Sequence, residues 1–309
     1  MSRISLEGQV AIVTGAARGL GRTYALDLAA HGAAVVVNDL PGGGAGTVVD
    51  EIGSAGGRAI AVERDIVDPE GARAVVEAAT GLGRLGILVN NAGMLRNGRF
   101  EELTAEKIRD ILAVHLAGAF FVTQPAFAAM RDVGYGRIVN VSSNTSFGMA
   151  GLVNYAAAKA GVLGLTTSLA QEGAPHGIAV NSVLPNGTST IMDDDPIPGF
   201  EDDTRFVAAF QGVAHRFEPE RTAALVTFLA SPACPASGEH FSSLGGRFAR
   251  VLYAVTEGWM SPAGAPAGAD DVAEHFAEIA DAGRIALLPT SIRDEFELVA
   301  RSLASDTRA

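Results

Sequence analysis

The sequence has little cysteine and few basic side chains. Its one cysteine, Cys234, cannot form an internal disulfide, so nothing argues for an oxidising compartment. The 23 lysines and arginines are outnumbered by 35 acidic residues, which argues against a nucleic acid partner, because phosphate binding needs a basic face. The chain also lacks a secretion signal and any run of about 18 apolar residues, the length of a membrane span. We expect a cytoplasmic protein with neither a membrane nor a nucleic acid partner.

Short apolar runs alternate instead with segments of helical spacing. The runs lack the polar alternation of half-exposed strands, so we expect both faces of each strand to be covered. They are residues 10–13, 33–37, 59–62, 87–89, 137–141 and 178–183. Alternating strands and helices predict an α/β protein with a doubly wound parallel sheet, whose ligand lies beyond the carboxyl ends of the strands.

A glycine-rich segment, TGAARGLG at residues 14–21, directly follows the first apolar run. Gly15 permits a tight turn, while Gly19 and Gly21 let the backbone approach a pyrophosphate. The N–H groups at the start of the following helix then face the phosphates. A plain turn is the alternative, but the position directly after a strand favours a nucleotide.

Asp39 ends the second run and indicates which nucleotide binds. A carboxylate at this position accepts both ribose hydroxyls of NAD and repels a 2′-phosphate. Arg18 and Arg22 favour the alternative, because a cation near that ribose serves NADP. We predict NAD, with NADP as the less favoured cofactor. The six histidines show no metal-ligand spacing, so no metal is expected.

Tyr155 and Lys159 lie four residues apart, on one face of a predicted helix. A free phenol, with a pKa near about 10, is a poor base at neutral pH, and a nearby ammonium lowers that pKa. Read alone, such a pair is usually a pair on a helix surface. Ser142 stands thirteen residues before the tyrosine, where its hydroxyl is expected to hold a substrate oxygen beside the phenol. Ser143 is the rival candidate.

In their order and spacing, the glycine loop, Asp65, the NNAG segment at 90–93 and the Ser142, Tyr155 and Lys159 set resemble the short-chain dehydrogenase/reductase family over nearly residues 4–260. The resemblance implies a Rossmann-type sheet of about seven strands and a nicotinamide-dependent interconversion of alcohol and ketone. It implies that Tyr155 is the acid/base, that Lys159 lowers its pKa and binds the nicotinamide ribose, and that Ser142 positions the carbonyl.

The resemblance also implies which residues surround the cofactor. Asp65 is expected by the adenine, Asn90 as a support at the fourth strand and Thr190 near the carboxamide. The expected cofactor-binding residues are Gly15, Arg18, Gly19, Leu20, Gly21, Asp39, Asp65, Ile66, Asn91, Ala92, Gly93, Tyr155, Lys159, Pro185 and Thr190.

Two positions depart from the family pattern. His115 stands where most members have a catalytic Asn that anchors a water in a proton relay to the lysine. Two interpretations stay open: the histidine takes over a related catalytic task, or it packs the helix and bonds a carbonyl. Asn186 stands where a glycine usually follows the proline.

Around both positions the sequence is similar to that of one branch of the family. This branch is the (3R)-hydroxyacyl-CoA dehydrogenase part of peroxisomal multifunctional enzymes of type 2 (17β-hydroxysteroid dehydrogenases type 4). The shared segments are 38–40, 91–96, 114–116 and 185–186. The branch implies oxidation of a (3R)-hydroxyacyl-CoA with NAD, and some relatives act on steroids. We predict a dehydrogenase domain over 1–260, with a substrate lid at about 187–220. A mostly helical extension, 261–309, is part of that domain or an oligomer contact.

The acidic lid leaves the substrate class open. Residues 193–195 and 201–203 are most simply a solvated loop. If they face the substrate, they would repel the negative charges of a CoA thioester, whereas Arg96, Arg99, Arg205 and Arg216 would attract these charges. A neutral steroid or polyketide ketone is the alternative, and a non-catalytic nucleotide-binding scaffold is the second one. By resemblance we also expect a homodimer or homotetramer.

Overall fold

The computed structural model describes residues 4–186, 195–261 and 266–306. It divides into two compact units, Met1–Arg250 and Val251–Ala309, which are described separately. The second unit starts ten residues before the predicted start of the extension, directly at the end of the last strand of the main sheet.

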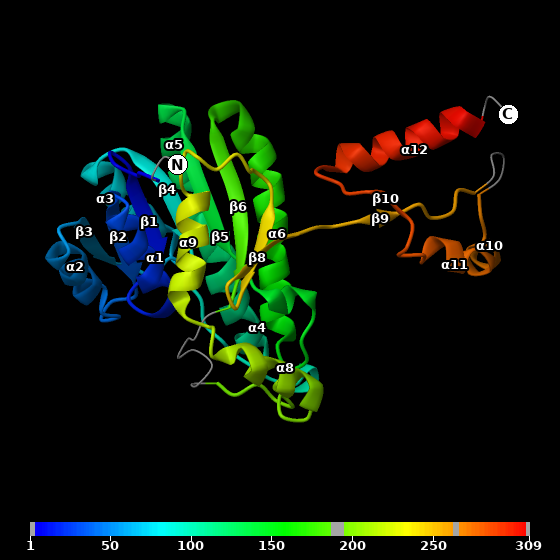
Figure 1. Cartoon of the computed structure of the whole chain (residues 1–309), viewed down its shortest axis with the longest axis horizontal. Coiled ribbons are helices and arrows are strands. Elements are labelled where there is room, and N and C mark those ends of the chain that lie inside the picture. Colours follow the sequence, from blue (N-terminus) through cyan, green and yellow to red (C-terminus); the bar gives the residue numbers. More distant parts are fainter. Residues whose placement is uncertain (1–3, 187–194, 262–265, 307–309) are drawn as a thin grey trace. The chain divides into compact units, whose positions relative to one another are not determined.

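Eight strands form the sheet of the first unit, in the order β3-β2-β1-β4-β5-β6-β7-β8 (Figure 1). Neighbouring strands from β3 to β7 run parallel, so their carboxyl ends meet at one edge. The predicted Rossmann-type α/β fold is confirmed, with eight strands instead of about seven. The strands are β1 (Val10–Thr14), β2 (Ala34–Asp39), β3 (Arg58–Glu63), β4 (Leu85–Asn90), β5 (Gly136–Val141), β6 (Ile178–Pro185), β7 (His240–Leu244) and β8 (Arg247–Val251).

Helices cover both faces of this sheet, with α1, α2 and α9 on one face and α3, α5 and α6 on the other. The helices of the first unit are α1 (Gly19–Ala30), α2 (Ala45–Ser54), α3 (Pro69–Leu82), α4 (Ala105–Leu112), α5 (Gly118–Val133), α6 (Val153–Gly173), α8 (Thr204–Ala214) and α9 (Pro219–Leu229). Short helical turns link them: η1 (Phe100–Glu102), η2 (Ala113–Ala117), η3 (Asn144–Phe147) and η4 (Ala174–His176).

The fully apolar runs follow from two separate cores. Successive strand residues point to opposite faces of a sheet. Val13 accordingly joins the core under α1, α2 and α9, whereas Ile12 joins the core under α3 and α5. A central strand therefore needs apolar residues at nearly every position.

The second unit combines helices with a small antiparallel sheet. Its helices are α10 (Ala269–Glu274), α11 (Phe276–Ile279) and α12 (Ile292–Asp306), and its strands are β9 (Val255–Thr256) and β10 (Ile285–Leu287). The indole of Trp259 stacks on the ring of His275 at a centroid distance of 4.1 Å.

One helical stretch, 105–133, is long and apolar enough for a membrane span by length and composition alone. It comprises α4, η2 and α5, and α5 packs against α3 and β4 within the first unit.

Candidate active site

The glycine loop lies against the end of β4. Gly15 and Gly19 have φ angles of 61° and 55°, in the left-handed region that favours glycine. A Cβ on Gly15 would lie 2.6 Å from the Cα of Ala92, so no larger residue fits there. The Asn91 side chain donates to the carbonyls of Thr14 and Gly15, both at 3.0 Å, and so ties the two segments together.

The start of α1 fits the pyrophosphate of a dinucleotide. Arg18 is its N-cap residue, and no side chain caps the helix there. The first N–H groups of the helix are therefore available to an anion, and the helix dipole favours one.

The residues on which the choice between NAD and NADP is expected to depend are Asp39, Arg18 and Arg22. The Asp39 carboxylate accepts a hydrogen bond of 2.9 Å from the backbone N–H of Ala17, which places it directly beside the glycine loop. Arg22 is ion-paired with Glu51, with Nε 3.2 Å from Oε1. Arg18 is exposed at the helix start. One of the two cations that favour NADP is therefore already held by a carboxylate.

The other predicted cofactor residues lie along the same edge. Asp65 forms a turn by accepting from the N–H of Val67 at 2.9 Å, and Ile66 is buried beside it. Pro185 ends β6. Thr190 and the lid segment 187–194 lie outside the described residues. The described part of the predicted lid contains α8.

Tyr155 and Lys159 share one face of α6, as their spacing predicts. Lys159 is buried, its Nζ donates to the carbonyl of Val141 at 2.6 Å, and it lies 5.6 Å from the centre of the Tyr155 ring. The pair therefore lies at the carboxyl end of β5, beside the predicted cofactor edge.

The two adjacent serines have exchanged their expected orientations. The Ser142 hydroxyl is buried and donates to the carbonyl of Lys159 at 2.8 Å. The side chain that hydrogen-bonds the Tyr155 phenol is that of Ser143, which is also only partly buried. The Ser142 hydroxyl thus points to the backbone of α6 and the Ser143 hydroxyl to the phenol, and which of the two serines acts in catalysis stays a prediction. The physical reason is the strand geometry, since successive residues at the end of β5 point to opposite sides.

Burial sets the proton affinities of the pair. It raises the pKa of Tyr155 to about 12, against a smaller lowering by the hydrogen bond from Ser143. Burial also lowers the pKa of Lys159 to about 7. Burial thus shifts both groups toward their neutral forms, and the lowering of the phenol pKa by the ammonium stays a prediction.

His115 lies beside the same pair, on the π-helical turn η2. Its ring meets the Tyr155 ring edge to face, at a centroid distance of 5.0 Å and an angle of 89°. Its Nε2 lies 2.7 Å from the carbonyl oxygen of Met94. A Cβ on Gly93 would lie 2.5 Å from Cε1 of this ring, so the imidazole needs a glycine there.

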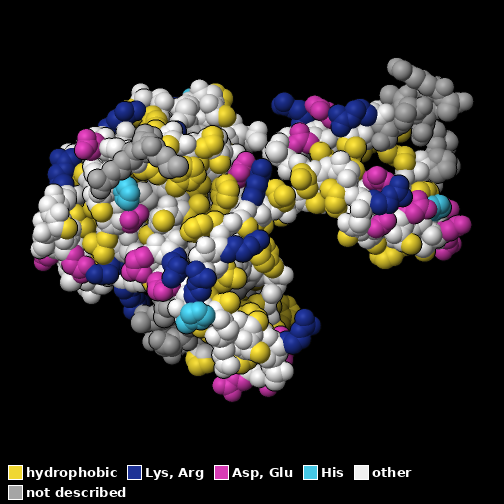
Figure 2. Space-filling model, viewed as in Figure 1, with side chains coloured by type: hydrophobic (Ala, Val, Ile, Leu, Met, Phe, Trp, Pro, Cys, Tyr) yellow, Lys and Arg dark blue, Asp and Glu magenta, His cyan; other side chains and the backbone are white. Residues whose placement is uncertain are grey.

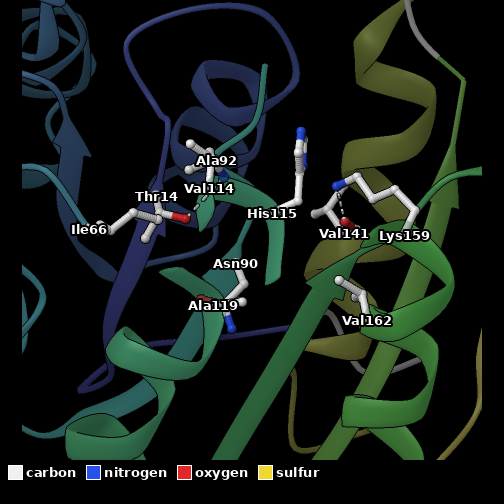
Figure 3. A pocket seen from close by; sticks show the side chains of 10 residues that line it. All are labelled: Thr14, Ile66, Asn90, Ala92, Val114, His115, Ala119, Val141, Lys159 and Val162. Atoms are coloured by element: carbon white, nitrogen blue, oxygen red, sulfur yellow. Dashed lines mark hydrogen bonds between the residues drawn. The ribbon is translucent and has the colours of Figure 1, made fainter. Parts of the chain in front are cut away.

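A cavity of about 10 Å³, the room of roughly one water, separates His115 from the sheet. Figure 3 shows side chains from several elements arranged around it. They are Thr14, Ile66, Asn90, Ala92, Val114, His115, Ala119, Val141, Lys159 and Val162.

A buried polar chain supports the site from below. The Asn90 side chain donates to Thr123 and Asn140, both at 2.8 Å, and Asn140 donates to Thr166 at 3.0 Å. The chain joins β4 and β5 to α5 and α6. Asn140 and Thr166 were not predicted from the sequence, although Asn140 is a polar residue inside the apolar run 137–141, which was the available signal.

The comparisons with known proteins agree with this geometry. The family model for short chain dehydrogenases matches residues 9–197, more than half of the chain. The chain belongs to the short-chain dehydrogenase/reductase family. This is a family of oxidoreductases that act on CH–OH groups, the enzyme class expected from the sequence, and its cofactor is NAD or NADP.

Similar proteins include members of the expected branch. Peroxisomal multifunctional enzyme type 2 from Drosophila melanogaster is 38% identical over 254 residues, which cover 79% of this chain and 40% of that enzyme. Its full-length structure has a TM-score of 0.80 at 30% identity, over 98% of this chain and 50% of that one. Hydroxyacyl-CoA dehydrogenase ChsB1 from Mycobacterium tuberculosis is 41% identical over 242 residues, 74% of each chain.

These similarities confirm the family and the resemblance to the multifunctional-enzyme branch. The chain spans less than half the length of the Drosophila enzyme. A dehydrogenase from Beutenbergia cavernae, solved with bound NADP at low occupancy, is 35% identical, with a TM-score of 0.71 over 78% of this chain and 97% of that one. Family membership thus leaves NAD and NADP open. The cytoplasmic location and the homodimer or homotetramer stay predictions.

The buried lysine predicts how stability depends on pH. Folded Lys159 releases its proton near pH 7, whereas unfolded lysine keeps it to about pH 10.5, so the unfolded state binds more protons between these values. The free energy of unfolding should therefore rise from pH 7 to pH 9 by about 2 kcal/mol more in the wild type than in Lys159→Met. Urea denaturation of the cofactor-free proteins measures this difference. Equal slopes with pH would contradict a buried, neutral lysine.

Proposed function

We propose that the chain is an NAD-dependent oxidoreductase that interconverts a secondary alcohol and a ketone, with a (3R)-hydroxyacyl-CoA as substrate. The observation that carries the reaction is the placement of Tyr155, Lys159 and Ser143 together beside the glycine loop. NADPH and a neutral ketone are the competing cofactor and substrate.

In the oxidative direction, Tyr155 takes the hydroxyl proton of the substrate while the hydride leaves the same carbon. Bound NAD supplies the hydride acceptor and, when oxidised, a positive charge. Ser143 donates a hydrogen bond to the substrate oxygen that becomes the carbonyl. This bond stabilises the negative charge that the oxygen carries in the transition state. Lys159, held by the carbonyl of Val141, offers a positive charge to the ionised phenol.

A pair of arginines supports a substrate with phosphate groups. Arg216 and Arg221 converge on the turn between β7 and β8, since a Cβ on Gly246 would lie 3.1 Å from one guanidinium and 3.3 Å from the other. Glu218 forms an ion pair with Arg221, and the charge of Arg216 also contributes to holding the pKa of Glu218 below its usual value. Figure 2 shows basic side chains gathered near the junction of α8 and α9, beside an exposed histidine.

Of the four arginines expected to attract the CoA charges, Arg216 lies beside Arg221, which was not among them. Arg96 lies 3.6 Å from Asp110 and is partly neutralised by it. Residues 201–203 are acidic and exposed, which is the observation that favours a neutral ketone instead.

The two serines provide a test of the site. Ser143→Ala should lower kcat for reduction of a 3-oxoacyl-CoA by about 10²–10³-fold, because it removes the donor to the carbonyl oxygen. Ser142→Ala should keep most of the activity and lose stability instead, because the carbonyl of Lys159 loses its donor. Steady-state kinetics and thermal melting of both variants measure this. The reverse result would restore the assignment made from the sequence.

The cofactor proposal predicts a preference for NADH that depends on Asp39. Fluorescence titration should show tighter binding of NADH than of NADPH, and Asp39→Ala should reduce that preference by about tenfold or more, because the ribose hydroxyls lose their acceptor. Arg22→Gln is the matched control and should change the preference little, since Glu51 already neutralises this arginine. Tighter binding of NADPH by the wild type would overturn the choice of NAD.

The substrate proposal is tested with one acyl group on two carriers. A 3-oxoacyl-CoA carries phosphates, whereas the same acyl group on N-acetylcysteamine carries none. Changing both Arg216 and Arg221 to Gln should lower kcat/KM about tenfold for the CoA thioester and leave the other thioester unchanged. Arg205→Gln, on exposed α8, is the control. Turnover of a steroid ketone but of neither thioester would favour the neutral substrate. If the fluorescence titration shows binding of neither NADH nor NADPH, the result favours a non-catalytic scaffold.

A further inference from the structure

Asp195, an acidic residue of the predicted lid, is tied to the loop that follows β4. Its carboxylate accepts a hydrogen bond of 2.5 Å from the backbone N–H of Asn97, and its backbone carbonyl accepts another from the Asn97 side chain. Asn97 is 3% exposed and lies between β4 and η1. Residues 201–203 of the same predicted lid are exposed. Asp195 is thus held by protein groups and differs from its acidic neighbours along the chain.

The loop that holds Asp195 is itself fixed at two further points. The ammonium of Lys107, on α4, donates to the carbonyl of Asn97 at 2.6 Å. The backbone N–H of Gly98 donates to the carbonyl of Gly151, just before α6, at 3.1 Å. A Cβ on Gly151 would lie 3.0 Å from the carbonyl oxygen of Pro198. The loop after β4, the residues before α6 and the described start of the predicted lid therefore meet at one place.

Asn154 joins this loop to the helix that carries Tyr155. It is 5% exposed and lies in the first turn of α6, directly before the tyrosine. Its Nδ2 donates to the carbonyl of Arg96 at 2.9 Å and to that of Lys107 at 3.4 Å. Its Oδ1 accepts from the backbone N–H of Tyr155 at 2.9 Å. The first N–H groups of a helix have no partner within it, so this side chain supplies the partner of the tyrosine N–H.

One peptide group carries the hydrogen bonds of both side chains. The carbonyl of Arg96 and the N–H of Asn97 belong to the same peptide bond, and they point in opposite directions because that bond is trans. The N–H donates to Asp195 and the carbonyl accepts from Asn154. Hydrogen bonds in such a chain polarise one another, and a carboxylate acceptor strengthens the effect. The bond to Asp195 therefore strengthens the bond to Asn154.

We propose that Asp195 and Asn154 are positioning residues at the two ends of one hydrogen-bonded connection, which fixes the place of Tyr155. The connection consists of the Asp195 carboxylate, the peptide group between residues 96 and 97, the Asn154 amide and the N–H of Tyr155. It makes the position of the phenol depend on a residue of the predicted lid. This inference rests on the proposed alcohol and ketone chemistry, in which a displaced phenol slows proton transfer.

Two substitutions of Asp195 distinguish this connection from a charge that acts on the substrate. Asp195→Ala removes the acceptor and should lower kcat about tenfold, both for a 3-oxoacyl-CoA and for the same acyl group on N-acetylcysteamine, because the phenol is misplaced for both. Asp195→Asn keeps an acceptor and should stay within about twofold of the wild type. Glu201→Gln, which removes a charge from an exposed position of the predicted lid, is the matched control and should leave kcat unchanged. A change confined to the CoA thioester, equal in Asp195→Ala and Glu201→Gln, would overturn the inference.

A double-mutant cycle tests whether the two ends act together. Asn154→Ala should lower kcat about tenfold at a temperature where circular dichroism shows each variant fully folded. In the Asp195→Ala background the same change should cost less than about threefold, because both residues act through one peptide group. Costs that multiply, or an unchanged kcat in folded Asn154→Ala, would show that the residues serve stability alone and would overturn the inference.

Hydrogen exchange measures the connection without any substrate. In the cofactor-free protein, Asp195→Ala should speed amide exchange about tenfold or more at Asn97 and also at Tyr155, while Asp195→Asn should change it little. Unchanged exchange at Tyr155 in Asp195→Ala would overturn the inference. If the wild type turns over neither a ketone nor an alcohol, the proposed function fails, and the exchange at Tyr155 still decides whether the connection exists.

Discussion

The burial of one amino group, that of Lys159, is the constraint on which the rest of the site depends. A buried charge is costly unless neighbouring groups compensate it, and the pKa of this lysine near 7 records that cost. Two neighbours can compensate it: the carbonyl of Val141, which accepts from Nζ, and the phenol of Tyr155 once it is ionised. When Lys159 is protonated, its charge is little screened by water and stabilises the ionised phenol of Tyr155.

The fold supplies this arrangement through the carboxyl edge of its parallel sheet. The end of β5 carries Val141 and the two serines, while β4 ends at the segment that packs on the glycine loop. The polar chain through Asn90, Asn140 and Thr166 crosses the apolar core and ties both strands to α5 and to α6, which carries Tyr155 and Lys159. The amide N–H groups of the chain are paired, whereas the buried Oδ1 of Asn90 has no hydrogen-bond partner among the described residues.

The sequence was sufficient for the parts governed by regular geometry. Apolar runs such as 10–13 predicted central strands, and a spacing of four predicted that Tyr155 and Lys159 share a helix face. It was insufficient where the outcome depends on the direction of one backbone turn or on burial. The order of Ser142 and Ser143 depends on how β5 leaves the sheet. The pKa directions depend on desolvation, and the convergence of Arg216 with Arg221 depends on tertiary packing.

Tyr155 is proposed to transfer the proton while a hydride passes between cofactor and carbonyl carbon. This role is tested by the single-turnover rate of NADH oxidation by a 3-oxoacyl-CoA, for the wild type and Tyr155→Phe, with NADH binding measured in parallel. We expect a loss of about 10²–10⁴-fold in rate with unchanged NADH affinity, because the phenol oxygen alone is removed. If Tyr155→Phe keeps the wild-type rate, Tyr155 is not the proton donor.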